Sequence, residues 1–590
     1  MSSATAFAYK FGCFSLLPAD KQLLHNDTPV PLAPKAFDTL LLLVQNQGHL
    51  LEKDAFLKRI WPDSFVEEVA LAHSISQVRK ALRTGASESE FIETVPKRGY
   101  RFVAAVEAVG PAADVRPPRT RLAVLPFANL SADPERDYVA DGLTEEVIAA
   151  LGQVDPEHFG VIGRTSMMAY KGATKSLAKM GAELNAEFLI ESSIRAEGDR
   201  LRITSRLIRA SDQMQMWSAS FDSQPPSVLE LQRQLSTAIA HQVQRHLSPE
   251  RINALERRQP RHIEAYDLYL RGRYFSNQLS PLTTRRALEF YARAIELDPD
   301  YGLAWGGLAM AYAGSPINGD APPLHVWPRA REAAAHAVRA APDLAETQTS
   351  LGVLKFWLDW DWMGAEAACR RAIALDSSFG LAQRMLGVVL SALGRHKEAL
   401  VAMRRARELD PFDFTHHALS AQVAFTARDY LTAVESARQA ILLNPEFWVA
   451  HYQLAQAYER LGRYDSSLDA LQSAGLFSDG NSKVISLRGY VLARLGRTSE
   501  AKDLLHALET VPRDKYMPPY ALALLHAGLD EREAALECLE RAFDAHDVHL
   551  VLLVIDPKWD TFREEARMLA VIERCGFVDA TASTRRSLSP

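Results

Sequence analysis

Hydrophobic and polar positions follow different periods in three parts of the chain. Residues 7–107 open with short alternating runs, which predict a small antiparallel sheet. Apolar residues then recur three and four positions apart, the spacing of a buried helix face, at Phe37, Leu40, Leu41 and Val44. Further helices are predicted over about residues 52–61 and 67–82, and two strand-like segments that flank residues 96–99 predict a closing hairpin. We therefore expect a small α+β domain.

Strand-like and helix-like segments alternate over residues 121–247. Their order is strand, helix, strand, helix, three strands and a last helix over about residues 228–247. Such alternation predicts a sheet domain of the α/β or α+β class, and α/β is our prediction. Residues 108–120 lack apolar periodicity and contain three prolines, so we expect them to be a linker.

Residues 262–590 are predicted to be all-helical and repetitive. One column of alanines has separations of 34, 68 and 34 residues, a second keeps the same register, and two prolines are 34 residues apart. Three independent columns with one period predict helix pairs that stack into a superhelix. The columns are Ala399, Ala433, Ala501 and Ala535; Ala406, Ala440, Ala474 and Ala542; and Pro411 and Pro445.

Composition narrows the class of protein without naming a function. The residues are 47% hydrophobic and 24% charged, a composition that excludes wholesale disorder. A chain of 590 residues is too long for one domain. The net charge of −6 repels phosphate, so contact with nucleic acid requires a local basic surface. Four cysteines lie far apart, and no apolar run approaches the ~18 residues of a spanning helix. We expect a reduced, cytoplasmic protein with no disulfide framework, cofactor, metal or membrane contact.

The helix predicted over about residues 67–82 has two distinct faces. At 100° per residue, Leu71, Ile75, Val78 and Leu82 share one stripe. The opposite stripe holds His73, Ser76, Gln77 and Lys80. A polar helix face is most often only solvated, so the pattern alone leaves both solvent and a bound partner open.

The segment SQVRKALR followed by IETVPKRGYRF decides between these alternatives. It resembles the winged-helix DNA-binding domain of OmpR/PhoB-type response regulators and of their ToxR- and CadC-like relatives, over about residues 7–107. The resemblance implies that the third helix enters the major groove of double-stranded DNA and that the hairpin reaches towards the minor groove. It also implies at least two copies on DNA, at tandem half-sites.

The same resemblance assigns roles to individual residues. It implies base-edge contacts by His73, Ser74 and Gln77, phosphate contacts by Arg79 and Lys80, and a wing that carries Thr94, Lys97 and Arg98. The helical wheel independently supports His73, Gln77 and Lys80, and it places Ser74 and Arg79 on the flanks. Gln77 stands where many relatives have arginine, and glutamine can make a bidentate contact to adenine. We therefore expect a different preferred operator.

The repeat columns resemble the tetratricopeptide repeat, with Leu386-Gly387, Ala399, Ala406 and Pro411 at its characteristic positions. The resemblance implies a concave groove that binds a protein or peptide, or a second copy of the chain. The alternative is that the helices only act as a spacer. Trp357, Trp360 and Trp362 could anchor a partner, although packing between repeats is the favoured interpretation.

The middle region opens with RLAVLPFANLSADPERDYVADGLTEEVIAAL, which resembles the TolB-amino-terminal-like or FlgO-like domain. That resemblance implies no catalytic role. The acidic residues here allow a metal site, but acids at a helix start favour its dipole, which is our interpretation. These residues are Asp133, Asp137, Asp141, Glu145 and Glu146.

No phosphate-binding loop, zinc-protease motif, nucleophile elbow or dinucleotide fingerprint occurs in the sequence. We therefore predict a bacterial, non-enzymatic, sequence-specific transcriptional regulator involved in signal transduction. The alternative class is a scaffold whose winged helix binds protein, such as RNA polymerase. A third hypothesis is a module that acts beside a cyclase domain, or whose own catalytic domain has been lost.

Overall fold

The computed structural model describes most of the chain, and its contacts divide the chain into residues 1–117 and 118–590. We call these the N-terminal unit and the large unit, and each is described by itself. The described residues are 8–12, 14–17, 22–25, 28–60, 68–82, 91–96, 98–104, 106–109, 120–131, 137–154, 159–197, 200–223, 234–235, 238, 262–276, 281–512 and 515–577.

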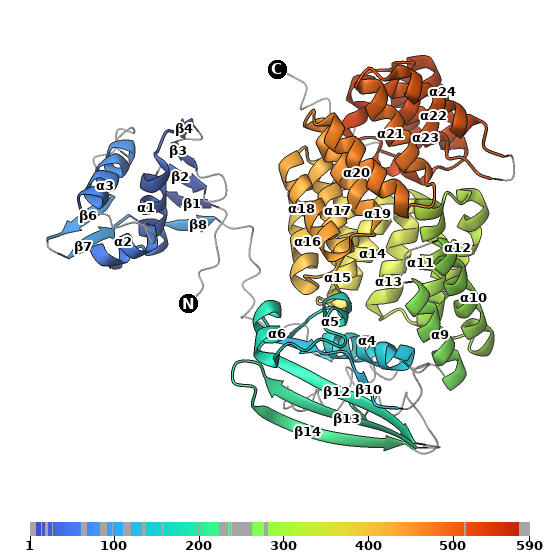
Figure 1. Cartoon of the computed structure of the whole chain (residues 1–590), viewed down its shortest axis with the longest axis horizontal. Helices are drawn as coiled ribbons and strands as arrows, with labels where there is room; N and C mark the ends of the chain where they lie inside the picture. Colours follow the sequence, from blue (N-terminus) through green and yellow to red (C-terminus); the bar gives the residue numbers. More distant parts are fainter. Residues whose placement is uncertain are drawn as a thin grey trace. The chain divides into compact units, whose positions relative to one another are not determined.

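The described residues of the N-terminal unit form two small sheets and three helices (Figure 1). An antiparallel five-stranded sheet has the order β4-β3-β2-β1-β8, and a three-stranded sheet has the order β5-β7-β6. The first sheet comprises β1 (Ala8–Phe11), β2 (Phe14–Leu17), β3 (Gln22–His25), β4 (Thr28–Val30) and β8 (Glu107–Val109). The second comprises β5 (Leu50–Glu52), β6 (Ile92–Val95) and β7 (Gly99–Phe102), and the helices are α1 (Pro34–Gln45), α2 (Lys53–Ile60) and α3 (Glu68–Leu82).

Aromatic packing joins these elements into one core. Phe11 packs edge-on against Phe102 with the ring centroids 5.1 Å apart, and both side chains are buried. The hairpin of β6 and β7 depends on Gly99, because a Cβ there would lie 1.9 Å from the Leu51 carbonyl oxygen of β5. This close approach explains the glycine in the closing hairpin that the sequence predicts. The α+β winged-helix fold is confirmed.

The large unit begins with a mixed sheet of order β11-β9-β12-β13-β14, and β10 pairs with β12. Strands β11, β9 and β12 are parallel, whereas β12, β13 and β14 are antiparallel. The elements are β9 (Thr120–Val124), β10 (Ala128–Asn129), α4 (Asp137–Val154), β11 (Phe159–Val161), α5 (Arg164–Met168), α6 (Leu177–Leu184), β12 (Phe188–Glu197), β13 (Arg200–Arg209) and β14 (Gln215–Ser223). The helix predicted over residues 228–247 lies almost entirely outside the described residues.

Period-two alternation in β9 places helices on both faces of this sheet. Leu122 and Val124 join the apolar cluster that contains α4, and Ala123 joins the cluster that contains α5 and α6. Alternate side chains of one strand point to opposite faces, so the buried strand needs apolar residues throughout.

Antiparallel helix pairs fill the rest of the large unit and confirm the predicted repeats (Figure 1). Column residues such as Ala399 and Ala406 are fully buried where paired helices cross. The helices are α9 (Ile263–Ser276), α10 (Pro281–Leu297), α11 (Gly302–Gly319), α12 (Pro323–Ala340), α13 (Ala345–Leu354), α14 (Trp362–Leu375), α15 (Gly380–Ala392), α16 (His396–Leu409), α17 (Phe414–Thr426), α18 (Tyr430–Leu443), α19 (Trp448–Arg460), α20 (Tyr464–Phe477), α21 (Ser482–Arg494), α22 (Thr498–Glu509), α23 (Pro519–Gly528) and α24 (Arg532–Asp544). A π-helical turn η2 (Lys355–Asp359) interrupts the array, and η3 (Val548–Leu552), η4 (Pro557–Phe562) and α25 (Ala566–Arg574) complete it.

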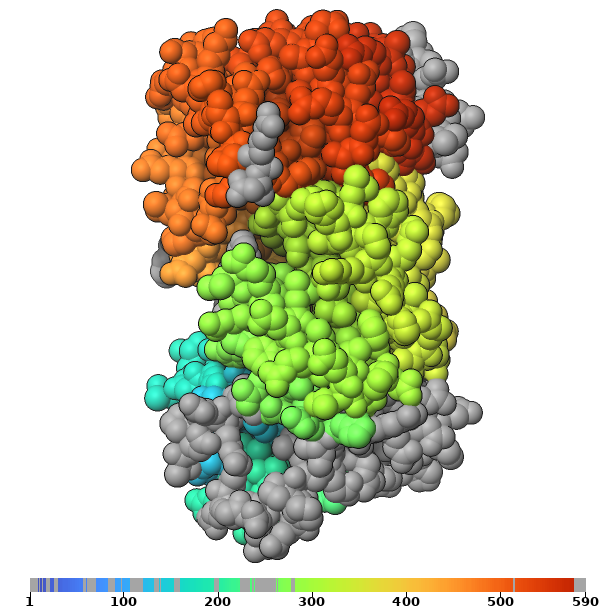
Figure 2. Space-filling view, turned by 90° about the vertical axis from the view of Figure 1, so that its right-hand side faces the viewer, coloured from blue at the N-terminus to red at the C-terminus, as the bar shows by residue number. Residues whose placement is uncertain are grey.

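The superhelix closes on itself, because repeats far apart in the sequence touch. The Asn481 side chain donates to the Asn318 carbonyl oxygen at 3.0 Å, and the Ser482 amide donates to Asp320 at 2.8 Å. Figure 2 shows the green first repeats directly against the red last ones. The inner side of the superhelix is therefore not an open groove.

Two of the three tryptophans that the sequence singles out, Trp360 and Trp362, lie against the C-terminal segment. His546 is stacked between Trp327 and Trp360, with ring centroids 4.1 and 4.0 Å away. Trp362 is buried and donates to the Cys575 carbonyl oxygen at 3.2 Å. Trp360 and Trp362 thus pack between the array and its C-terminal segment.

A buried carboxylate joins the sheet domain to the repeats. Asp410, which follows α16, accepts hydrogen bonds from the backbone amides of Ser166 at 2.7 Å and Thr165 at 3.1 Å, at the start of α5. The Leu409 carbonyl oxygen also accepts from the Gly163 amide at 2.8 Å. Backbone amides at a helix start otherwise lack intrahelical partners, so the repeats complete the sheet domain.

We predict that Asp410→Ala accelerates hydrogen exchange of the Thr165 and Ser166 amides at least about tenfold, because hydrogen bonds to a charged group contribute ~1.5–3 kcal/mol. Mass spectrometry of the full-length protein measures this locally. Asp469→Ala, at an exposed position of α20, is the matched control. Equal exchange in the two variants would contradict the assigned junction.

Candidate nucleic-acid interface

Helix α3 presents one polar stripe and buries the opposite face. Leu71, Ile75 and Val78 are buried, whereas His73 and Lys80 are exposed and Gln77 is half-buried. Arg79 and Lys80 lie in the last turn, where cations interact favourably with the helix dipole. The faces agree with those the helical wheel predicts.

Ser74 is not on the exposed face. Its side chain belongs to the buried side of α3, and the residue is only 5% exposed. It lies one position from Ile75 and three from Leu71, so the buried face is wider than the apolar stripe alone. This burial argues against the direct base contact that the resemblance implies for Ser74.

His73 and Gln77 are coupled one helical turn apart. The Gln77 side-chain nitrogen and the His73 Nε2 are 2.9 Å apart in a hydrogen bond. In that bond Gln77 donates, so its amide oxygen stays available as an acceptor. The pair therefore offers adjacent polar groups on an exposed face, as recognition of a base edge requires.

Arg79 binds the hairpin from within the domain. Its Nη2 donates to the Ile92 carbonyl oxygen and to the Thr94 hydroxyl, both at 2.8 Å. The sequence predicts a phosphate contact for Arg79 but not its contact with the hairpin, because no spacing rule links position 79 to position 92. The guanidinium holds β6 against α3, which makes Arg79 a positioning residue.

The wing residues are only partly described. Thr94 and Arg98 are exposed, and Arg101 of β7 forms a 3.3 Å ion pair with Glu93 of β6. Lys97 lies outside the described residues. The exposed cations that the described part of α3 and the hairpin offers to a polyanion are thus Lys80 and Arg98.

The acidic residues of α4 pair with cations. Lys171 binds Asp141 at 2.7 Å, Arg164 binds Glu145 at 3.3 Å, and Arg273 of α9 binds Glu146 at 2.8 Å. Asp137 is the first residue of α4, where an acidic side chain interacts favourably with the helix dipole. Asp133 lies outside the described residues. Within the described ranges no cluster of histidine, cysteine or acidic residues is arranged to hold a metal ion.

Three known families match separate parts of the chain. Residues 27–102 match the family described as "Transcriptional regulatory protein, C terminal". Residues 118–238 match "HilA/YgeH-like transcriptional regulator, second domain", and residues 361–414 and 419–481 match "Tetratricopeptide repeat". The chain therefore contains an OmpR/PhoB-type domain, a middle domain like that of HilA and YgeH, and tetratricopeptide repeats.

Curated relatives include both regulators and a cyclase. "Transcriptional regulator HilA" of Salmonella typhimurium is 23% identical over 401 residues, 67% of this chain and 69% of that protein. "Putative adenylate cyclase 3" of Rhizobium meliloti is 32% identical over 194 residues, 33% of either chain. The chain thus spans about a third of the length of that cyclase. Among solved structures, the DNA-binding domain of Escherichia coli CadC aligns at 29% identity and a TM-score of 0.17, over 18% of this chain and 99% of that one.

These findings support DNA and protein as partners of the regulator domain and the repeats, respectively. Among the described residues, no helix is both long enough and apolar enough to span a bilayer. The remaining question is which side chains meet DNA.

We predict that Arg79→Met accelerates hydrogen exchange in β6 about threefold to tenfold, since each lost hydrogen bond contributes ~0.5–1.5 kcal/mol. Lys80→Met is the matched control, because Lys80 is the next residue of α3 and its side chain is exposed. Exchange in β6 of the full chain is the measurement. Similar rates in the two variants would mean that Arg79 does not hold the hairpin.

Proposed function

We propose that the chain is a sequence-specific DNA-binding transcriptional regulator that inserts α3 into the major groove. The observation that carries the proposal is the polar stripe of exposed His73 and Lys80 and half-buried Gln77, on a helix whose other face is buried. Its place in a domain that matches transcriptional regulatory proteins supports the same function.

The proposed contacts divide by chemistry. His73 and Gln77 contact base edges, because their polar groups face outward and can donate and accept. Lys80 from α3 and Arg98, Lys97 and Thr94 from the wing contact phosphate or sugar, where charge supplies affinity without sequence preference. Arg79 acts through the hairpin that it positions, and Ser74 has no part in the contact.

Further parts of the proposal concern the assembly. Two or more copies bind tandem half-sites, and the outer surface of the repeats binds a protein, with RNA polymerase a candidate. The protein acts in the cytoplasm, where the chromosome is accessible, and it performs no catalysis. A HilA-like order of domains supports this organisation.

We expect Gln77→Ala to change the preferred operator rather than abolish binding. Loss of one bidentate contact removes ~1–3 kcal/mol of discrimination at one base pair. Selection from random DNA with the wild-type and variant full chains measures the preference at each position. An identical selected motif would show that Gln77 does not meet a base.

We expect Lys80→Ala to weaken binding to all sequences alike. Loss of one phosphate contact lowers the slope of log affinity against log salt by about one. Lys502→Ala, whose exposed lysine lies on α22 of the repeats, is the control. An unchanged slope for Lys80→Ala would remove Lys80 from the interface.

A further inference from the structure

The closed superhelix surrounds a cavity of about 270 Å³. Its walls come from α9, α11, α13, α15, α17, α19, α21, α23 and the segment that contains η3, so residues more than 270 positions apart line one space. The volume is near the lower end of small-molecule sites, ~300–1,000 Å³. A folded protein partner is too large for such a space.

Most of the cavity wall is apolar and aromatic. Trp357, Phe425 and Trp448 line it, together with aliphatic side chains such as Met385 and Leu419. Flat aromatic walls favour a ligand with an apolar body, because contact with the rings removes apolar surface from water. This wall alone does not set the charge of the ligand.

Lys483 places a partly buried cation on the cavity wall. Its ammonium donates to the Ile317 carbonyl oxygen at 2.6 Å and lies 5.9 Å from the centre of the Trp448 ring. Burial lowers the pKa of Lys483 to about 8, although Asp320 and Asp547 act to raise it. The ammonium would attract the acid group of a ligand that enters the cavity, because charges interact more strongly there than in bulk water.

Two further polar groups on the wall have unused hydrogen-bonding capacity. The Arg384 Nε and the His549 Nε2 are buried without a hydrogen-bond partner in the part of the chain that the structure describes. His549 is 9% exposed, and its other ring nitrogen lies 2.7 Å from Asp547. Arg384 shares Asp413 with His416, at 3.8 and 2.9 Å. In a neutral ring that donates from Nδ1 to Asp547, the His549 Nε2 is an acceptor.

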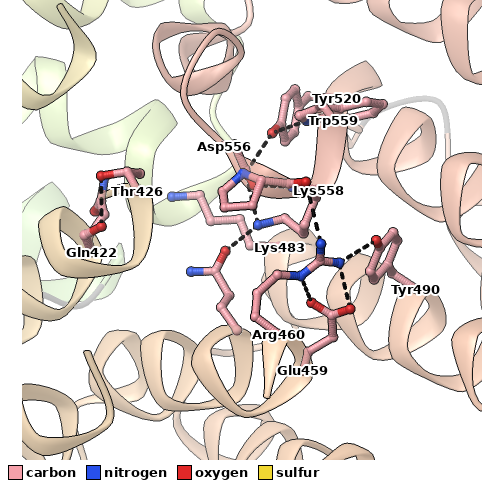
Figure 3. A network of polar contacts seen from close by, with 12 residues as sticks. Gln422, Thr426, Glu459, Arg460, Lys483, Tyr490, Tyr520, Asp556, Lys558 and Trp559 are labelled. Carbon is pink, nitrogen blue, oxygen red and sulfur yellow. Dashed lines mark hydrogen bonds and ion pairs between the residues drawn. The ribbon is translucent and has the colours of Figure 1, made fainter. Parts of the chain in front are cut away.

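The acid on the cavity wall already has its own cation. Lys558 lies 2.8 Å from Asp556 and also donates to Gln456 at 2.5 Å. Figure 3 shows Asp556 and Lys558 next to each other. Gln456 in turn donates to Gln453 at 2.8 Å. Lys558 pairs with Asp556, so Lys483 and Arg384 are the lysine and arginine of the lining that have no carboxylate partner within the lining itself. Their acidic neighbours are Asp320 and Asp547 for Lys483 and Asp413 for Arg384, all outside the lining.

We propose that this cavity binds a small organic anion with an apolar body, whose acid group lies beside Lys483. Binding is a property of the repeats alone. That the bound anion is the input signal of the regulator rests on the proposed function above.

Two fluorescent probes test the charge requirement on the full chain. 8-Anilinonaphthalene-1-sulfonate is the anionic probe, and N-phenyl-1-naphthylamine has the same rings without the sulfonate. We expect saturable binding of one sulfonate probe per chain, weakened about tenfold in Lys483→Met, since a hydrogen bond to a charged group contributes ~1.5–3 kcal/mol. The neutral probe should bind both proteins equally, and Lys502→Met should match the wild type.

A steric variant tests the location independently. Gly314 of α11 lines the cavity, and a Cβ there meets nothing within 4 Å, so Gly314→Leu adds volume without a clash at its base. We expect it to weaken both probes while its thermal unfolding remains cooperative. If Lys483→Met does not fold, Gly314→Leu still tests whether the probes bind in this cavity.

Absence of saturable binding to the wild type, or wild-type affinity for the sulfonate probe in Gly314→Leu, would overturn the proposal. Equal loss of both probes in a folded Lys483→Met would overturn the anion requirement. DNA binding is measured separately on the same preparations. A protein that binds DNA but no probe would contradict the cavity proposal and leave the proposed function intact.

Discussion

The buried carboxylate of Asp410 is the contact on which the arrangement of the large unit depends. It lies between a repeat and the sheet domain, where it satisfies amides that begin α5. Burial and the neighbouring Asp413 raise the pKa of Asp410 above its usual range. Such a group remains buried only because several donors surround it, so neither domain keeps its native junction without the other.

This junction is electrostatically linked to the inside of the superhelix. Burial acts to raise the pKa of Asp413, but His416 and Arg384 outweigh it and lower the pKa. Arg384 lines the cavity, and Asp413 stands three positions after Asp410. A charge bound beside Arg384 would therefore act on a carboxylate next to the junction. The large unit thus has a physical connection between its interior and the sheet domain.

The sequence predicts what depends on local spacing. Helix α3, the β6–β7 hairpin and the repeat helices follow from period and from turn residues, and the stripe of His73, Gln77 and Lys80 follows from the wheel. The wheel places Ser74 on a flank and does not give the width of the buried face, so it does not reveal that Ser74 is buried.

Contacts between distant positions could not be predicted. Arg79 reaches Ile92 through the fold, and Asp410 resembles the aspartates that end other repeats, such as Asp298. A 34-residue period specifies how neighbours stack, and it contains no information on closure, which depends on Trp327, His546 and Trp360. The cavity exists only because of that closure.

The central claim is that this chain recognises particular DNA sequences. Genome-wide mapping of the DNA bound by the chain in its native cell tests it most directly. If the chain is the proposed regulator, it will occupy discrete sites that share a motif and are arranged as tandem half-sites. Binding at these sites will be lost when His73 and Gln77 are replaced together by alanine. A chain that enriches no motif-bearing sites, while still assembling with protein partners, would contradict the claim and identify a scaffold.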